Sequence, residues 1–447
     1  MTRFADIEKA LDARWPESRL DPSLDRIAAL TALLGDPQHA VPAVHITGTN
    51  GKTSTARMVD ELLRATGPRT GRSTSPHLQT VRERIVIDGA PISEEGFVAA
   101  YETVRPAVES LDRELPVRLS FFEVVTAMAF VAFARAGLDA VVVEVGMGGS
   151  WDATNVVDGR VAVVTPISLD HTEYLGPDVA SIAREKAGII KPGSVAVLAA
   201  QPEAAELVLR DRCRAVAAEV RGATASHHRG EPTARPDGQT LYLTVRGRDC
   251  PGLFLPLLGR YQAENARVAL TAVDAFLGAE GSVLSAAQAH RGMSRVRAPG
   301  RLEHLRDTPP VLVDASHNPA GMAATVRALR ESLAALGVER VVVVLAVLRG
   351  KDVDGVVRAL DPVASAVVVS QNESPRALPA AELAASATPL LGAGRVLVEA
   401  RLDDAIDVAV RLAHGPEGRA AVLVTGSVVT AGAARGLIAP DTARSAW

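Results

Sequence analysis

Short runs of apolar, largely β-branched residues alternate along this chain with longer Ala- and Leu-rich segments of helical period. The short runs predict strands at 44–46, 140–145, 161–164, 311–313, 341–348, 366–370 and 421–425. The longer segments predict helices at 54–63, 179–187 and 321–336. This alternation is typical of parallel sheets whose strands are joined by crossover helices. Two α/β units are the simplest account of the pattern.

Breaker residues divide the chain between these two units. The segment 295–300 (RVRAPG) has the composition of an interdomain linker, so a boundary is placed near residue 298. The predicted domains are therefore 1–297 and 298–447. Within the first domain, residues 224–238 are polar and rich in Gly and Pro, and 240–245 alternate between apolar and polar. This stretch predicts a loop within a small β insertion.

The bulk composition excludes several classes of protein. The chain has 447 residues, 47% hydrophobic and 22% charged, which fits a globular protein of two or three domains. A net charge of -4 means that the chain has no overall excess of positive charge to attract a nucleic acid. Two cysteines, Cys213 and Cys250, are too few for a disulfide framework or a metal knuckle.

The termini and apolar runs predict no membrane association. The first 15 residues carry charges where a signal peptide needs an apolar stretch, and the longest apolar runs, 127–134 and 341–348, are far shorter than the ~20 residues that span a bilayer. We therefore expect a cytoplasmic protein with neither a nucleic acid nor a membrane as partner. We also expect a monomer.

The strongest chemical signal is a glycine-rich segment between the predicted strand 44–46 and the predicted helix 54–63. Its residues are Gly48, Thr49, Asn50, Gly51, Lys52, Thr53 and Ser54. In such a loop, backbone N–H groups at a helix N-terminus bind phosphates, the lysine reaches the terminal phosphates and a hydroxyl faces Mg²⁺. The strict pattern has glycine where Ile46 stands, so this is a variant of the phosphate loop. It predicts ATP and Mg²⁺ as cofactors, and an ordinary glycine-rich turn is the alternative.

Lysine is scarce in this chain, so each lysine that remains is a candidate for a chemical role that arginine cannot fill. Only five of the 48 basic residues are lysines. A compact ammonium that can lose its proton does what a permanently charged guanidinium cannot. Lys52 in the glycine-rich loop and Lys186 in the segment REKAG are therefore candidates for chemistry. For Lys186 the alternative is an ammonium that complements the negative end of a helix.

Polar residues cluster just after several predicted strands. Glu144 lies near the end of the strand 140–145, and Asp170-His171 follow the strand 161–164. A carboxylate in a buried strand is costly unless it is paired or bound to a metal, and ligands of α/β sheets gather beyond the carboxyl ends of strands. In the second half, Asp314 follows the strand 311–313, and Arg301 is a candidate phosphate clamp. Each is also explained by a structural hydrogen bond or ion pair.

Nine motifs in consistent order resemble those of the folylpolyglutamate synthases, relatives of the Mur ligases. They are TGTNGKTS (47–54), TSPHL (74–78), SFFEVVTA (120–127), EVGMGG-x-WDATN (144–155), LDHTEYLG (169–176), REKAGIIK (184–191), GRYQAENA (259–266), PGRLE (299–303) and DASHNP (314–319). The resemblance implies an α/β fold, with a P-loop ATPase domain built on a parallel sheet, a smaller Rossmann-like C-terminal domain, and catalysis in the cleft.

The same resemblance implies roles for individual residues. Lys52, Lys186, His171 and Glu144 are implied in catalysis, and Lys186 matches the lysine that this family carbamylates. The implied ATP contacts are the loop residues 48–54 with Asn265, Arg301 and Asp314. The implied Mg²⁺ ligands are Ser75, Glu144 and His171. The implied substrate residues are Ser120, Phe121, Phe122, Glu123, Trp151, Asp152 and Ala153 on the pterin side, with the segment 20–26, and His317 and Ser427 for the incoming glutamate.

The sequence departs from the family pattern at two places. Ser150 stands where the family usually has arginine, and Arg72-Ser73 replace an apolar pair before TSPHL. We interpret both as lying on the substrate-facing side. They leave the ATP chemistry intact and affect the geometry of the substrate site.

The resemblance implies an ATP-dependent ligase that adds L-glutamate to a folate, and also to dihydropteroate, through an acyl phosphate. One alternative is a cell-wall Mur-type ligase, but only 47 residues precede Gly48, too few for the separate UDP-binding domain of those enzymes. Another is a regulator that binds nucleotide without catalysis, which would need the loop but not Glu144, His171 and Lys186 together. The small-molecule partners expected are therefore folate or dihydropteroate, L-glutamate and ATP.

Overall fold

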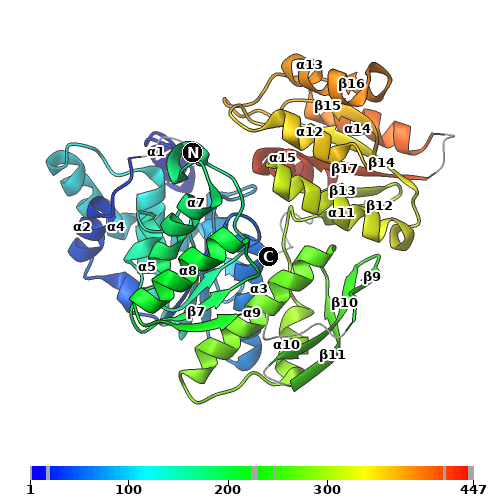
Figure 1. The fold of residues 1–447 in the computed structure, drawn as a ribbon. Coiled ribbons are helices and arrows are strands. Elements are labelled where there is room, and N and C mark those ends of the chain that lie inside the picture. Colours follow the sequence, from blue (N-terminus) through cyan, green and yellow to red (C-terminus); the bar gives the residue numbers. More distant parts are fainter. Residues whose placement is uncertain (1–2, 17–20, 223–229, 246–247, 416–418, 441–447) are drawn as a thin grey trace. The chain divides into compact units, whose positions relative to one another are not determined.

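A computed structural model describes residues 3–16, 21–222, 230–245, 248–415 and 419–440 (Figure 1). The chain forms two compact units. The first comprises Met1–His228, Leu243–Cys250 and Glu264–Met293, and the second comprises Arg229–Tyr242, Pro251–Ala263 and Ser294–Trp447. The bounds of these units differ from those of the predicted domains, because parts of the β insertion belong to the second unit. As functional domains, 1–297 and 298–447 stay a prediction.

The first unit is built on a mixed eight-stranded sheet of order β4-β3-β2-β5-β1-β6-β7-β8. The strands are β1 (Ala43–Thr47), β2 (Thr70–Ser73), β3 (Ile85–Ile87), β4 (Ala90–Pro91), β5 (Ala140–Glu144), β6 (Gly159–Val164), β7 (Val195–Leu198) and β8 (Glu219–Gly222). From β2 to β8 neighbouring strands are parallel, whereas β3 and β4 pair antiparallel at one edge. The carboxyl ends of β1, β5 and β6 therefore lie side by side.

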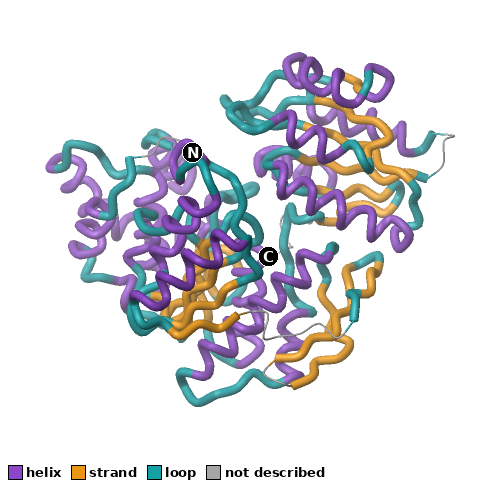
Figure 2. The backbone as a smooth tube through the Cα atoms, in the orientation of Figure 1, coloured by secondary structure: helices purple, strands orange, loops and turns teal. Residues whose placement is uncertain are grey.

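Helices surround this sheet (Figures 1 and 2). They are α1 (Arg3–Asp12), α2 (Asp25–Leu33), α3 (Lys52–Thr66), α4 (Glu94–Glu114), α5 (Phe121–Ala136), α6 (Thr172–Leu175), α7 (Val179–Lys186), α8 (Glu203–Ala215), α9 (Arg260–Gly278) and α10 (Ala286–Met293). Local sequence sets their ends. Ser120 and Glu123 form a capping box that begins α5, and Gly137, at φ 60°, ends it.

The second unit contains a six-stranded sheet of order β12-β13-β17-β14-β15-β16, parallel except for β12. Its strands are β12 (Glu303–Asp307), β13 (Pro310–Val313), β14 (Arg340–Leu345), β15 (Ala364–Val369), β16 (Val396–Val398) and β17 (Ala420–Thr425). Its helices are α11 (Pro319–Leu336), α12 (Val353–Leu360), α13 (Ala380–Leu391), α14 (Leu402–Ala413) and α15 (Val428–Ile438). The α/β class predicted from the sequence is confirmed.

Two predicted elements need correction. The strand predicted at 341–348 ends at Leu345, because its partners β15 and β17 end at Val369 and Thr425 and leave no ladder to continue. The loop predicted at 224–238 contains the strand β9 (Thr233–Arg235), which pairs with β10 (Gly238–Val245) beside β11 (Arg248–Leu255). Residues 223–229 of that loop lie outside the described residues. In the part of the chain that the structure describes, no helix has the length and apolar character needed to span a membrane.

Candidate active site

The phosphate loop connects β1 to α3, and its two glycines meet conditions that only glycine satisfies. Gly48 has φ 147°, and a Cβ there would lie 1.9 Å from Thr165 Oγ1. Gly51 has φ 87°, and a Cβ there would lie 2.6 Å from Asn265 Oδ1. Both angles fall in the region that favours glycine. The loop is therefore closely packed against Thr165, which follows β6, and against α9, where Asn265, predicted to contact ATP, lies beside it.

Hydrogen bonds to the segment after β6 hold the middle of the loop. The N–H groups of Thr49 and Asn50 donate to the Pro166 carbonyl at 3.1 and 3.3 Å. The Thr49 hydroxyl donates to the Ser168 carbonyl at 3.0 Å, and the Asn50 amide donates to the Ser168 hydroxyl at 3.3 Å. These hydrogen bonds hold the loop at the carboxyl edge of the sheet, directly before the first turn of α3.

The two lysines singled out from the sequence converge on one carbonyl oxygen. Lys52 Nζ donates to the carbonyls of Gly48 at 3.1 Å and Thr49 at 3.2 Å. Lys186, at the end of α7, is buried and donates from Nζ to the same Gly48 carbonyl at 2.9 Å. Burial and the nearby positive charge of Lys52 together lower the pKa of Lys186 to about 7, against the opposing charges of Asp170, Asp152 and Glu185.

A buried carboxylate lies at the end of β5, next to the phosphate loop. Glu144 Oε1 accepts a hydrogen bond from the Thr53 hydroxyl at 2.8 Å, and Oε2 accepts one from the Ser75 N–H at 3.3 Å. Of the three predicted Mg²⁺ ligands, Ser75 and Glu144 are therefore neighbours. His171 immediately precedes α6 with φ 50°, and its Nε2 lies 3.9 Å from Asp170 Oδ1.

These groups fit a magnesium ion only together with phosphate and water. Among the residues that the structure describes, no three His, Cys, Asp or Glu side chains gather at one point as a metal cage would require. Mg²⁺ usually keeps several waters and takes one or two carboxylates plus substrate phosphates. One carboxylate, Glu144, with the Thr53 hydroxyl beside the phosphate loop, matches that pattern.

The glycine loop after β5 brings several predicted pterin-side residues together. A Cβ on Gly146 would lie 2.7 Å from Phe122 Cζ and 3.2 Å from Asp152 Oδ2, so both side chains contact this glycine. A Cβ on Gly148 would lie 3.1 Å from Trp151 Cζ2. Asp152 is buried, and its Oδ2 accepts a hydrogen bond from the Met147 N–H at 2.8 Å. Ala153 begins the short helix η3 (Ala153–Val156).

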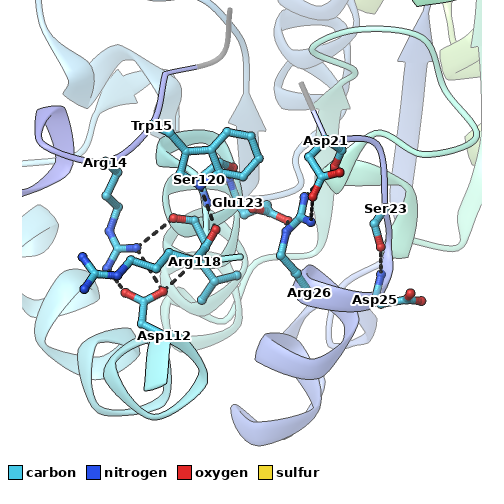
Figure 3. Close-up of polar contacts among 11 residues, drawn as sticks. Arg14, Trp15, Asp21, Ser23, Asp25, Arg26, Asp112, Arg118, Ser120 and Glu123 are labelled. Atoms are coloured by element: carbon cyan, nitrogen blue, oxygen red, sulfur yellow. Dashed lines mark hydrogen bonds and ion pairs between the residues drawn. The ribbon is translucent and has the colours of Figure 1, made fainter. Parts of the chain in front are cut away.

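The predicted substrate residues Ser120–Glu123 are anchored by the N-terminal segment (Figure 3). Glu123 accepts hydrogen bonds from the Ser120 N–H at 2.7 Å and from Arg26 Nε at 2.9 Å. Arg26 also donates to Asp21, and its guanidinium lies 5.3 Å from the centre of the Trp15 ring. Arg26 is thus a support for Glu123, and Leu20, the first residue of the predicted segment 20–26, lies outside the described residues. Phe121 lies beneath the Arg84 guanidinium at 5.0 Å.

The remaining predicted residues lie in the second unit. Asp314, after β13, accepts hydrogen bonds from the Leu302 N–H at 2.8 Å and from the Thr325 hydroxyl at 2.9 Å. Leu302 follows Arg301 directly in the sequence. His317 Nδ1 lies 3.0 Å from the Ala315 carbonyl. Ser427 is buried and caps α15 by accepting from the Thr430 N–H at 3.0 Å. This hydrogen bond gives the Ser427 hydroxyl a structural role, whatever else it binds.

The interpretation of Arg72 as a substrate-facing residue is wrong. Its side chain is 4% exposed and pairs with Asp60 of α3, which is 1% exposed, at 2.5 Å. The pair ties β2 to the helix that follows the phosphate loop. Ser150, the other departure, donates from its hydroxyl to the Glu185 carbonyl at 3.0 Å and so supports the segment that carries Lys186.

One buried polar residue of the site region escaped the sequence analysis. His45 stands in the middle of β1, between Val44 and Ile46, and is fully buried. Its Nε2 lies 2.9 Å from Thr154 Oγ1. The cost of burying a polar group in an apolar strand, which drew attention to Glu144, applies equally to His45 and would have identified it.

Family models match most of the chain, and curated relatives match almost all of it. Residues 46–273 match the Mur ligase middle domain, and residues 300–428 match the glutamate ligase domain of Mur ligases. The dihydrofolate synthase/folylpolyglutamate synthase of Mycobacterium tuberculosis is 48% identical over 97% of this chain and 94% of its own length. The chain belongs to the dihydrofolate synthase/folylpolyglutamate synthase family. The family member from Bacillus subtilis is 33% identical over 93% of this chain and 96% of its own length.

Solved structures of the family share the fold. The M. tuberculosis folylpolyglutamate synthase complexed with ADP and AMPPCP superposes with a TM-score of 0.92 at 46% identity, covering 98% of this chain and 99% of that one. Escherichia coli FolC in complex with DHPP and ADP gives a TM-score of 0.84 at 29% identity, covering 99% of both chains. Membership of this family confirms the resemblance inferred from the nine motifs.

Proposed function

We propose that this protein is an ATP-dependent glutamate ligase with both dihydrofolate synthase and folylpolyglutamate synthase activity. The observation that carries the proposal is the cluster at the carboxyl edge of the first sheet. There the phosphate loop, two lysines on the Gly48 carbonyl and the buried Glu144 adjoin one another. Relatives that match nearly the full chain carry both activities in their names, which supports the same pair here.

The reaction joins an acid to an amine at the expense of ATP. A carboxylate of the pterin substrate attacks the γ-phosphorus of ATP, ADP leaves, and an acyl phosphate forms. The amine of L-glutamate then attacks the acyl carbon and expels phosphate, leaving an amide. The backbone N–H groups at the start of α3 and the Lys52 ammonium stabilise negative charge on the transferring phosphoryl group.

Each group of predicted residues has a place in this scheme. The loop residues 48–54 and Asn265 hold the phosphates, together with Arg301 and Asp314 as further ATP contacts. Phe122, Trp151 and Asp152 bind the pterin side near Gly146, and His317 and Ser427 bind glutamate. Glu144 and Thr53 would hold Mg²⁺, with Ser75 and His171 as further ligands. Bound Mg²⁺ supplies charge neutralisation for the phosphates.

Lys186 is the residue whose chemistry the structure most directly supports. Its amine is buried, its pKa is about 7, and the Lys52 charge lies close by. A neutral amine attacks CO₂ and, after losing a proton, becomes a carbamate that carries a negative charge. Lys52 would stabilise that charge, as would Mg²⁺ when bound. We infer that Lys186 acts as a carbamate.

Release of ADP, measured with each acceptor, tests the function. We expect ADP to accumulate steadily only when a pterin acceptor and L-glutamate are both present, with dihydropteroate and with a reduced folate. Turnover with a UDP-linked acceptor instead would favour a cell-wall ligase. Nucleotide binding without turnover on any acceptor would favour the regulator and refute the proposal. The cytoplasmic location and the monomeric state stay predictions.

A further inference from the structure

A buried chain of hydrogen bonds runs from the centre of β1 to the pterin-side loop. His45 Nε2 lies 2.9 Å from Thr154 Oγ1, and the Thr154 hydroxyl donates to Asp152 Oδ1 at 2.5 Å. The Thr154 N–H donates to the same oxygen at 3.0 Å. All three residues are buried, and the contacts join positions 109 residues apart in sequence.

The direction of these hydrogen bonds follows from the donors available. Burial raises the pKa of Asp152, whereas hydrogen bonds from Met147 and Thr154 and the charge of Lys186 favour its ionised form. In that form the carboxylate only accepts, so the Thr154 hydroxyl donates its single proton to Asp152. Thr154 Oγ1 must then accept from His45, which places the imidazole proton on Nε2. His45 Nδ1 has no hydrogen-bond partner among the described residues, which suits a lone pair better than a second N–H. Burial, with Lys191 nearby, lowers the pKa of His45 to about 3, so the ring stays neutral.

Asp152 is the last residue in this series of hydrogen bonds and lies at the proposed acceptor site. Its Oδ2 accepts from the Met147 N–H at 2.8 Å and lies against Gly146, which the Phe122 ring also contacts. A carboxylate has about four acceptor positions. Oδ1 takes two hydrogen bonds from Thr154, and Oδ2 takes one, so Oδ2 retains one position. The hydrogen bonds from Thr154 fix the orientation of the Asp152 carboxylate, and that orientation sets the direction of the remaining acceptor position on Oδ2.

We propose that His45 and Thr154 are positioning residues for the pterin-bearing acceptor, which they serve by fixing the Asp152 carboxylate. This inference rests on the proposed function, because Asp152 acts on an acceptor only if the enzyme binds one. His45 is anchored on both sides, since β1 pairs with β5 and β6. The strand that carries the phosphate loop thereby also sets the position of the pterin-side carboxylate.

The rival explanation is that His45 and Thr154 only fill the core. Substitutions then lower stability but leave the affinity for each substrate unchanged. A role in positioning predicts a selective loss, in which KM for the pterin acceptor rises and KM for ATP and L-glutamate does not. The two explanations therefore differ in which kinetic parameter changes.

Thr154→Val removes the hydroxyl and keeps the shape, and Thr154→Ser restores the hydroxyl. Thr31→Val is the matched control, because Thr31 is equally buried and its hydroxyl bonds only to backbone carbonyls of α2. We expect Thr154→Val to raise KM for dihydropteroate about tenfold. Thr154→Ser and Thr31→Val should stay within about twofold, the size of an ordinary surface change.

His45 variants test the other end of the chain. His45→Gln places an amide donor near Nε2 and should retain most acceptor affinity, whereas His45→Leu should match Thr154→Val. The double variant His45→Leu/Thr154→Val should have a KM for the acceptor no higher than that of the single variants, because each single substitution already breaks the same series of hydrogen bonds. If His45→Leu does not fold, the Thr154 variants decide. Nitrogen NMR of the labelled imidazole should show an Nε2–H ring that does not protonate between pH 5 and 8.

Three outcomes would overturn the inference while leaving the proposed function intact. One is a folded Thr154→Val enzyme whose KM for the acceptor equals that of the wild type. Another is a rise of all three KM values together, and the third is an Nδ1–H tautomer for His45. Failure of the proposed function looks different, because the wild type itself would then turn over no pterin acceptor.

Discussion

Substitution of Lys186 separates a carbamate from a plain ammonium, because the two chemistries need different side chains. Arginine keeps a positive charge but forms no carbamate, and alanine removes both. We expect Lys186→Arg and Lys186→Ala each to lose on the order of 10²-fold or more in activity. A small carboxylate such as acetate should partly restore Lys186→Ala, because it returns a negative charge to the space left by the side chain. It should not restore Lys186→Arg.

The pKa of Lys186 sets the size of the pH effect. With a pKa of about 7, roughly nine tenths of the amines are neutral at pH 8 and about one tenth at pH 6, against well under 1% for an ordinary lysine at pH 8. Only the neutral amine attacks CO₂. Carbamylation at pH 6 should therefore be about tenfold less favourable than at pH 8 from this cause alone.

The same pKa predicts a cost in stability, in a defined pH window. A lysine whose folded pKa lies below its unfolded value destabilises the folded state as pH falls from about 10.5 to about 7, and below 7 the cost is complete. At pH 8 the cost is about 3 kcal/mol. Lys186→Met loses the hydrogen bond to the Gly48 carbonyl, worth about 1 kcal/mol. In bicarbonate-free buffer at pH 8 we expect Lys186→Met to be about 2 kcal/mol more stable than the wild type.

Two measurements decide the matter. Enzyme equilibrated at pH 6 or pH 8, with and without bicarbonate, is moved to one assay buffer and its initial rate of ADP release is followed. Carbon-13 NMR with labelled bicarbonate should show a carbamate signal in the wild type and none in Lys186→Arg. Lys186→Arg with most of its activity, or wild type indifferent to bicarbonate at both pH values, would refute the reasoning. Urea denaturation of Lys186→Met tests the stability estimate separately.

Three further predictions concern the phosphate loop and its neighbours. Lys52→Ala should abolish ligation while the melting temperature stays within about 2 °C, because Lys52 is only partly buried and donates to two carbonyls of its own loop. Near-normal ADP release would contradict the assignment. Glu144→Gln keeps the shape but removes a charge, so a Mg²⁺ titration should show a higher half-saturating concentration and a lower maximal rate, and an unchanged titration would make Glu144 structural. Gly48→Ala should abolish nucleotide binding in calorimetry, because its Cβ would lie 1.9 Å from Thr165 Oγ1 at a φ of 147°, and wild-type affinity would contradict the loop geometry.

Local order along the chain was enough to predict the phosphate loop. A strand, a glycine-rich turn and a helix lie within residues 43–66, which is the order that a phosphate loop requires. The close contacts that require glycine at 48 and 51 come from Thr165 and Asn265, outside that stretch. The position of Glu144 followed as well, because the carboxyl ends of parallel strands share one edge. Nine motifs in order then identified the family, which the comparisons confirmed.

Tertiary structure alone decided the contacts between distant segments. The sequence gives no sign that Arg72 pairs with Asp60, because that contact requires β2 to lie against α3. It does not reveal that Lys186, 138 residues from Gly48, shares the Gly48 carbonyl with Lys52, or that burial there lowers the pKa of Lys186. The link from His45 through Thr154 to Asp152 exists for the same reason. Hydrogen bonding and desolvation depend on which groups are brought within a few ångströms, and the strand order of the sheet determines that proximity.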